Sequence, residues 1–219
     1  RYGGREFTLE ERLLTQARVL WQYLSWMAVP NIIGMGIFHD DIPISQSLWS
    51  PVTTALSLLA WAVVLSAALL WHRRYPLVAC ALLFYLVAHS MESTVWPLEM
   101  VFEHRNYLPS MGFAVLAALG IVKGVARVER LRLRALVGGL LGLLLVLLLI
   151  RTNAWTDELS LARFNVINHP QSPRANFFYG NALFKRFQQS EELQLTEEEQ
   201  RALAVTSRRY FDNMRMMDE

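Results

Sequence analysis

Four apolar runs, separated by short polar segments, dominate the hydropathy pattern of the chain. Residues 51–71 form the first run, 21 residues without a charged side chain, which as a helix would be about 31 Å long. Residues 75–88, 108–122 and 135–150 form the others. Runs that are apolar throughout, rather than alternating, are typical of helices in lipid. We therefore predict an all-α fold, a polytopic helical membrane domain of about four spans.

The second run is the shortest of the four. Residues 75–88 number only 14, so the helix would cross a membrane only if it continued through His89 to about Trp96, or if neighbouring helices helped it. A continued helix would place Glu92 at membrane depth. An unpaired carboxylate is costly there and is usually functional.

An amphipathic helix is expected before the first span. Residues 8–11 read Thr-Leu-Glu-Glu, a capping box, and the following pattern runs to Val29, before Pro30. One face carries Leu9, Leu13, Leu20, Leu24 and Met27, and the other carries Glu10, Arg12, Gln16 and Arg18. The pattern favours a helix along the membrane surface, and the alternative is an amphipathic helix packed on a protein core.

Residues 151–219 read as a soluble helical tail. A helix is expected over 159–166, followed by a loop with two prolines, a helix around Gly180, and a last helix with Ala204, Tyr210 and Met214 inward. This pair resembles a tetratricopeptide (TPR) hairpin. One hairpin cannot bury its own face, so we expect it to dock on the membrane domain or the chain to continue beyond Glu219. The expected domains are 1–50, interfacial helix and external loop; 51–150, transmembrane helices; and 151–219, the TPR-like segment.

The distribution of charged residues predicts how the spans are oriented in the membrane. His72–Arg74 is basic, and residues 123–134 carry five basic side chains against one acid. The positive-inside rule places both segments in the cytoplasm. Residues 89–107, the segment around Asp40 and Asp41, and everything after Arg151 are then expected outside. Basic residues at membrane-flanking positions give no reason to expect nucleic acid as a partner.

Composition supports the membrane class and narrows the chemistry. The 219 residues are 53% hydrophobic with a mean hydropathy of +0.24, more apolar than most soluble domains. Cys80 is the single cysteine, which excludes an internal disulfide and a cysteine-based metal cluster. The chain starts at Arg1 without a signal-peptide pattern, so we expect a fragment of a longer protein, with part of an active site before Arg1.

Candidate chemistry gathers in the polar stretch His89–Gly112. Arg105 could fork onto phosphate oxygens, and Glu103 could fix that arginine or bind a sugar hydroxyl. His89, Glu92 and His104 are candidates for proton transfer or for binding a divalent cation. The alternative is a structural Glu103–Arg105 ion pair, with Trp96 and Tyr107 as interface anchors.

A second candidate is the pair Asp40 and Asp41, beside His39. Adjacent carboxylates can bind a hard cation or activate a hydroxyl as a base. The alternative is a solvated turn.

Three ordered motifs carry a family resemblance. Residues 102–112, FEHRNYLPSMG, resemble the Glu-Arg-x-x-Tyr-(Leu/Ile)-Pro-Ser-x-Gly signature of the transmembrane-and-TPR O-mannosyltransferases of the GT-C class, although His104 here separates the acid from the arginine. Residues 151–158 resemble the family's Arg-Asn-x-x-Trp-x-x-Glu junction, and 170–181 resemble the opening of its first repeat. FHDDIP, at 38–43, is similar to an Asp-rich external loop at a different offset.

The resemblance implies the C-terminal half of a membrane glycosyltransferase. It implies a polyprenyl-phosphate sugar donor, a protein acceptor presented by TPRs, and an external active site, which for a bacterial relative is the periplasmic face of the inner membrane. Tyr107, Glu103 and Arg105 would bind substrate, and Asp40 or Asp41 would be the carboxylate that activates the acceptor hydroxyl. The family's key acids precede Arg1, so whether this chain is itself an enzyme is left open. The alternative is a non-catalytic membrane scaffold that recruits a partner through its tail.

Overall fold

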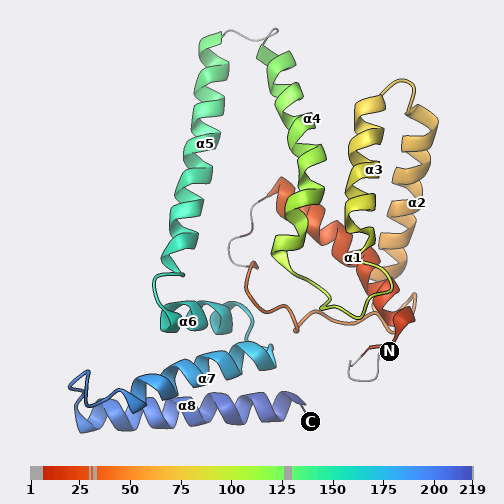
Figure 1. Cartoon of the computed structure of the whole chain (residues 1–219). Coiled ribbons are helices and arrows are strands. Elements are labelled where there is room, and N and C mark those ends of the chain that lie inside the picture. Colours follow the sequence, from red (N-terminus) through yellow and green to blue (C-terminus); the bar gives the residue numbers. More distant parts are fainter. Residues whose placement is uncertain (1–6, 30, 32–33, 126–129, 219) are drawn as a thin grey trace. The chain divides into compact units, whose positions relative to one another are not determined.

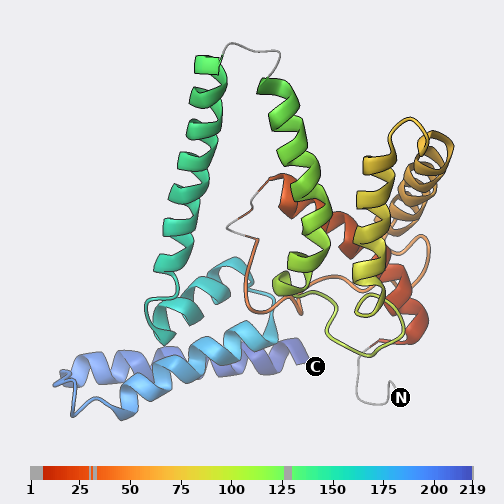
Figure 2. The same cartoon turned by 45° about the horizontal axis from the view of Figure 1, so that its top comes forward.

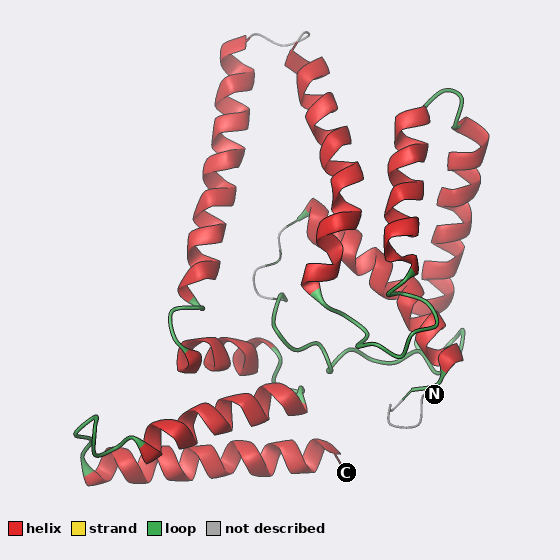
Figure 3. Ribbon diagram, in the orientation of Figure 1, coloured by secondary structure: helices red, strands yellow, loops and turns green. Residues whose placement is uncertain are grey.

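The computed structural model describes residues 7–29, 31, 34–125 and 130–218, and within these ranges the chain is helical without a strand (Figures 1 and 3). The all-α prediction is therefore confirmed. The chain divides into two compact units: unit 1 comprises residues 1–30 and 43–141, and unit 2 comprises residues 31–42 and 142–219. This division differs from the expected one, because the segment before the first span is shared between the two units.

Helix α1, Leu9–Ala28, begins where the capping box predicts. The Thr8 hydroxyl accepts a hydrogen bond from the Glu11 backbone N–H at 3.3 Å, and the Glu11 carboxylate accepts one from the Thr8 N–H at 2.7 Å. Two of the N–H groups that a helix start leaves unpaired are thereby satisfied. The helix ends one residue before Val29, and Pro30 follows in the sequence, as expected for a residue that cannot continue a helix.

The two faces of α1 are used in an unusual way. Arg12, Thr15 and Gln16 are buried inside unit 1 together with Val19, Tyr23 and Trp26, whereas Leu9 and Leu13 are exposed. The buried polar side chains of Arg12 and Gln16 satisfy backbone carbonyls inside the protein, and the exposed leucines are available to lipid.

Three helices are long and apolar enough to cross a membrane. They comprise α2 (Thr53–Trp71), the stretch Glu103–Gly124 that includes α4 (Tyr107–Val125), and residues 134–153 of α5 (Arg130–Asn153). In the apolar window of α5 no residue is buried within the protein, which leaves its whole surface for lipid or for another chain. The chain is therefore a membrane-associated protein.

Helix α3, Pro76–Ser90, is the short member of the set. Its 15 residues span about 22 Å, less than a bilayer core. Of the two alternatives, the continuation to Trp96 does not occur, because the chain turns directly after Ser90. Glu92 therefore lies in a turn beyond the helix end rather than on a membrane-spanning helix.

Close contacts and aromatic side chains hold unit 1 together. Helices α2 and α3 lie side by side, and α1 crosses them at an angle in both views (Figures 1 and 2). The Trp61 indole of α2 donates to the Ala17 carbonyl at 2.9 Å, and the Tyr85 hydroxyl of α3 donates to the Leu20 carbonyl at 2.6 Å. Both bonds end on α1, which is thus fixed by its backbone as well as by its side chains.

Unit 2 contains α6 (Glu158–Asn168), α7 (Pro173–Gln188) and α8 (Glu197–Asp218), with α7 and α8 forming an antiparallel pair (Figure 1). The predicted helical hairpin is therefore present. A Cβ added at Gly180 would lie 3.2 Å from the Phe211 ring, and the Ser207 hydroxyl donates to the Gly180 carbonyl at 2.8 Å. Glycine thus permits the close approach. Ser207 is the buried residue at this contact, while Ala204, Tyr210 and Met214 are half-buried.

Candidate functional site

The α3–α4 connector, residues 91–106, joins the end of α3 to the start of α4. It consists of turns and an extended stretch, and it ends in a 3-10 turn, η1 (Glu103–Asn106). Most of the ionisable residues singled out in the sequence lie on it or beside it. Its conformation is fixed mainly by side chains of α1, about 80 residues earlier in the chain.

Arg12 clamps the first half of the connector. Its guanidinium is fully buried and donates to three backbone carbonyls: Thr94 at 3.0 Å, Glu92 at 2.6 Å, and Leu98. The rigid fork of an arginine suits such multiple donation. One side chain thereby sets the course of seven connector residues.

Gln16 and Tyr23 extend this clamp along the same face of α1. The Gln16 amide donates to the Met100 carbonyl at 2.8 Å. The Tyr23 hydroxyl donates to the Phe102 carbonyl at 3.1 Å and accepts from the Phe102 N–H at 2.9 Å. Burial raises the pKa of Tyr23 to about 12, so the phenol keeps its proton and both bonds at neutral pH.

Arg105 is held on several sides. Its Nε lies 3.0 Å from a Glu92 carboxylate oxygen, its Nη1 donates to the Glu99 carbonyl at 2.7 Å, and its guanidinium lies 4.7 Å from the Phe102 ring centre. Only 9% of the side chain is exposed. The arginine thus fixes the fold of the connector, and it forms an ion pair with Glu92.

His89 is a packing residue in this structure. Its ring is stacked on Tyr23 at 5.1 Å between centres, meets Tyr85 edge-on at 4.7 Å, and places Nε2 3.4 Å from the Asn106 amide oxygen. It is buried at the end of α3. These contacts favour the structural interpretation of His89 over proton transfer.

The exposed members of the predicted set are His104 and Tyr107. His104 lies on η1, and Tyr107, which is 77% exposed, is the first residue of α4. Glu103 is half-buried between the connector and solvent. The 3-10 turn η1 runs directly into α4: the Tyr107 N–H donates to the His104 carbonyl, and Glu103 lies in the first turn of η1. The connector can therefore offer an imidazole and a phenol to a ligand.

Asp40 and Asp41 lie in unit 2, where both are engaged. Asp40 accepts the Ser172 hydroxyl and the Arg174 N–H (3.2 Å), which extends the N-terminal cap of α7. Asp41 lies 2.9 Å from Nδ1 of His169. Burial by itself raises the pKa of Asp41, but the hydrogen bond and charge of His169 outweigh burial and leave it below its usual value. These contacts fasten residues 37–41 to the α6–α7 turn.

The residues that the structure describes form no metal-binding site. Among these residues no group of three or more histidine, cysteine, aspartate or glutamate side chains could hold an ion. A divalent cation thus stays a prediction from the sequence alone.

Sequence reasoning missed the residues that hold the connector. Arg12, Gln16 and Tyr23 were assigned to a helix at the membrane surface, without a partner. Their spacing of four and seven residues places them on one helix face. A polar stripe at this spacing opposite exposed leucines was the signal that could have revealed them.

No family model, curated protein or solved structure matches the chain.

Proposed function

We propose that this chain is the C-terminal half of a membrane glycosyltransferase, in which the α3–α4 connector receives a polyprenyl-phosphate-linked sugar. The observation that carries the proposal is the clamp from α1, three side chains that fix the connector through backbone bonds. A plain link between two helices needs only turn residues. Ligand-binding loops, by contrast, need a rigid support that holds them in one conformation.

The donor phosphate is assigned to the N-terminal end of α4. His104 and Tyr107 lie at this end and are exposed. Their ring N–H and hydroxyl supply hydrogen-bond donors for phosphate or sugar oxygens. The polyprenyl chain would lie in the bilayer beside α4.

Arg105 acts in this proposal as a positioning residue. Its contacts with Glu92, the Glu99 carbonyl and Phe102 keep η1 in place, so it supports His104 and Tyr107 without being the principal phosphate ligand. Asp40 and Asp41 likewise serve as structural carboxylates. The acceptor is a protein held by the TPR-like tail, on the periplasmic side of a bacterial inner membrane.

Labelling with a photoreactive polyprenyl phosphate tests this assignment. The chain is reconstituted in phosphatidylcholine vesicles, and His104→Ala with Tyr107→Phe is compared with wild type. Loss of two hydrogen bonds of about 1 kcal/mol each should lower labelling by roughly tenfold or more. The matched control is Tyr210→Phe, a tyrosine on α8 that lies far along the chain from the connector. Equal labelling of the double variant and wild type would refute the assignment.

A membrane scaffold is the second candidate function, favoured by the surface of the α7–α8 hairpin. A hollow of about 430 Å³ lies between these helices, lined by Phe184, Phe187 and Phe211 beside Arg208 and Arg215. Phe177 and Val205 are also exposed. Aromatic and arginine side chains are enriched at protein interfaces. A partner segment with an apolar anchor and an acidic flank would fit this hollow.

The two candidates separate in one experiment. Phe184→Ser on the tail should abolish recruitment of a partner by a scaffold and leave polyprenyl phosphate labelling unchanged. His104→Ala with Tyr107→Phe should have the opposite effects. Val205→Ser, on α8 outside the hollow, is the control for loss of an exposed apolar side chain.

A further inference from the structure

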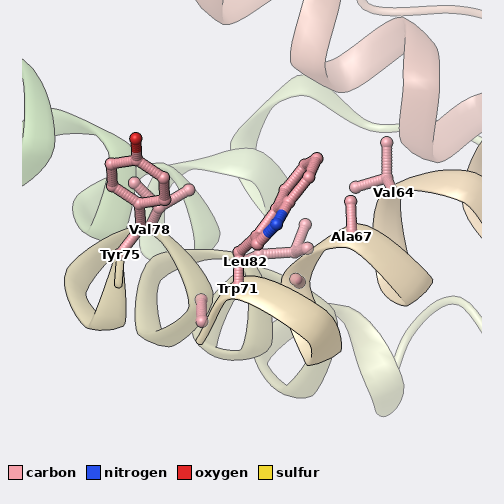
Figure 4. Close-up of a pocket in the computed structure, with 8 residues that line it drawn as sticks. Val64, Ala67, Trp71, Tyr75, Val78 and Leu82 are labelled. Carbon is pink, nitrogen blue, oxygen red and sulfur yellow. The ribbon is translucent and has the colours of Figure 1, made fainter. Parts of the chain in front are cut away.

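A second, chemically different hollow lies at the other end of α3, between it and α2. Its volume is about 360 Å³, within the range of ligand pockets. The residues that line it are almost entirely apolar, among them Val64, Ala67, Trp71, Tyr75, Val78 and Leu82 (Figure 4). This hollow adjoins the turn at residues 72–75, about 22 Å along α3 from the connector described above.

Alanines create the space. Ala67 and Ala68 of α2 face Ala79 of α3 across the hollow, and three such short side chains leave a gap where leucines would have packed. Trp71 and Tyr75, both exposed, rise at the ends of the turn, with Val78 beside Tyr75 (Figure 4). From Val64 to Trp71 the hollow follows α2 for about 10 Å.

The turn beside the hollow is cationic. Arg73 and Arg74 are exposed, and the Arg74 guanidinium lies 5.7 Å from the Tyr75 ring centre. No acidic residue occurs anywhere in the sequence between Asp41 and Glu92. Two arginines without acidic neighbours in the sequence thus stand at the mouth of an apolar gap, at the interfacial depth that tryptophan and tyrosine favour.

We propose that this hollow binds the acyl chain of an anionic phospholipid, whose headgroup phosphate lies against Arg73 and Arg74. The exposed leucines around it, Leu69, Leu70 and Leu77, mark a lipid-facing surface rather than a seat for a polar peptide. Arginine pairs with phosphate through two parallel hydrogen bonds. Basic residues at a membrane surface select anionic over zwitterionic lipids, by about 1 kcal/mol for each charge. The site is independent of the proposed sugar donor.

Photolabelling by two lipids tests the proposal. The whole chain is reconstituted in phosphatidylcholine vesicles that contain a trace of phosphatidylglycerol or phosphatidylcholine with a photoreactive acyl chain. Labelled residues are located by mass spectrometry. Labelling of Val64, Val78 and Leu82 by phosphatidylglycerol should exceed that by phosphatidylcholine roughly 25-fold, fivefold for each arginine. Arg73→Gln with Arg74→Gln should abolish the difference, whereas the matched control Lys123→Gln, at the end of α4, should preserve it.

A second part of the experiment fills the hollow with a larger side chain. Ala68→Phe should remove labelling of Leu82 by either lipid, while Leu59, outside the hollow, is labelled as before. If Ala68→Phe does not fold, Ala67→Leu is used in its place. Equal labelling by the two lipids, or labelling of Leu82 that survives both substitutions, would overturn the proposal. Inorganic phosphate should not displace the probe, and displacement would show that the turn binds free phosphate instead. Polyprenyl phosphate labelling at the connector should not change in any of these variants.

Discussion

The guanidinium of Arg12 donates to the backbone carbonyl of Glu92 at 2.6 Å, across 80 residues of sequence. The same side chain also donates hydrogen bonds to the carbonyls of Thr94 and Leu98, and it is fully buried. One arginine of α1 therefore holds the turn that carries Glu92, and Glu92 in turn pairs with Arg105. This chain of contacts makes the connector a supported surface rather than a loose link.

Replacement of Arg12 should destabilise unit 1 and loosen the connector. Arg12→Met keeps the volume but leaves three buried carbonyls without their donor, at a cost of about 3 kcal/mol in unfolding free energy. Thermal unfolding should shift accordingly, and chymotrypsin should cut faster after Phe102. Arg209→Met, an exposed arginine on α8, is the control and should behave as wild type. Unchanged cleavage of Arg12→Met would contradict the clamp.

Arg105 and Glu92 should be energetically coupled. A double-mutant cycle with Arg105→Gln and Glu92→Gln should give a coupling energy of about 1–2 kcal/mol, since the arginine is nearly buried and the acid is 28% exposed. The two single variants should each destabilise the protein, and the double variant should be less destabilised than their sum. Additive effects would mean that the pair seen at 3.0 Å contributes nothing.

Two glycines of α4 offer a matched test of helix packing. A Cβ at Gly112 would lie 3.1 Å from the Ala81 Cα of α3, whereas nothing lies within 4 Å of one at Gly120. Gly112→Ala should therefore force α3 and α4 apart and cost about 1–3 kcal/mol. Gly120→Ala should leave stability unchanged or raise it slightly, because alanine is the better helix former. Equal effects of the two substitutions on thermal unfolding would exclude this close contact.

Acid should weaken the link between Asp41 and His169. Because the pKa of Asp41 is lower in the folded protein, its ionised form stabilises the fold above the unfolded pKa of 3.8, and that contribution disappears as pH falls through the folded value. Asp41→Asn should therefore unfold at a lower temperature than wild type near neutral pH, and the difference should vanish once the pH lies below the folded pKa of Asp41. A difference that persists there would exclude the carboxylate as its source.

The helices could be predicted from the sequence because their signals are local. The capping box at Thr8, the uncharged run that became α2 and the glycine at 180 each mark an element within a few residues. The end of α3 could not be decided from the sequence, for a physical reason. Residues 91–96 stay in turns partly because Arg12, far away in the sequence, satisfies their carbonyls, and no local pattern shows such a bond.

The candidate site was predictable only in part. The polar stretch itself was identified, but the roles of its residues depend on partners elsewhere in the sequence. Arg105 pairs with Glu92, 13 residues earlier in the chain, and Asp41 contacts His169 across 128 residues. Periodicity and composition carry no information on such pairs. The buried polar face of α1 was also hidden, since a helix with leucines on one side ordinarily turns them inward.

The most direct test of the central proposal is to map where a photoreactive polyprenyl phosphate attaches to the wild-type chain in vesicles. We expect the label to concentrate on His104, Tyr107 and the first turn of α4, and to be suppressed by unlabelled polyprenyl phosphate but not by polyprenol, which lacks the anion. Label spread evenly over the lipid-facing surfaces of α2, α4 and α5, or suppressed equally by polyprenol, would contradict a phosphate site at the α3–α4 connector.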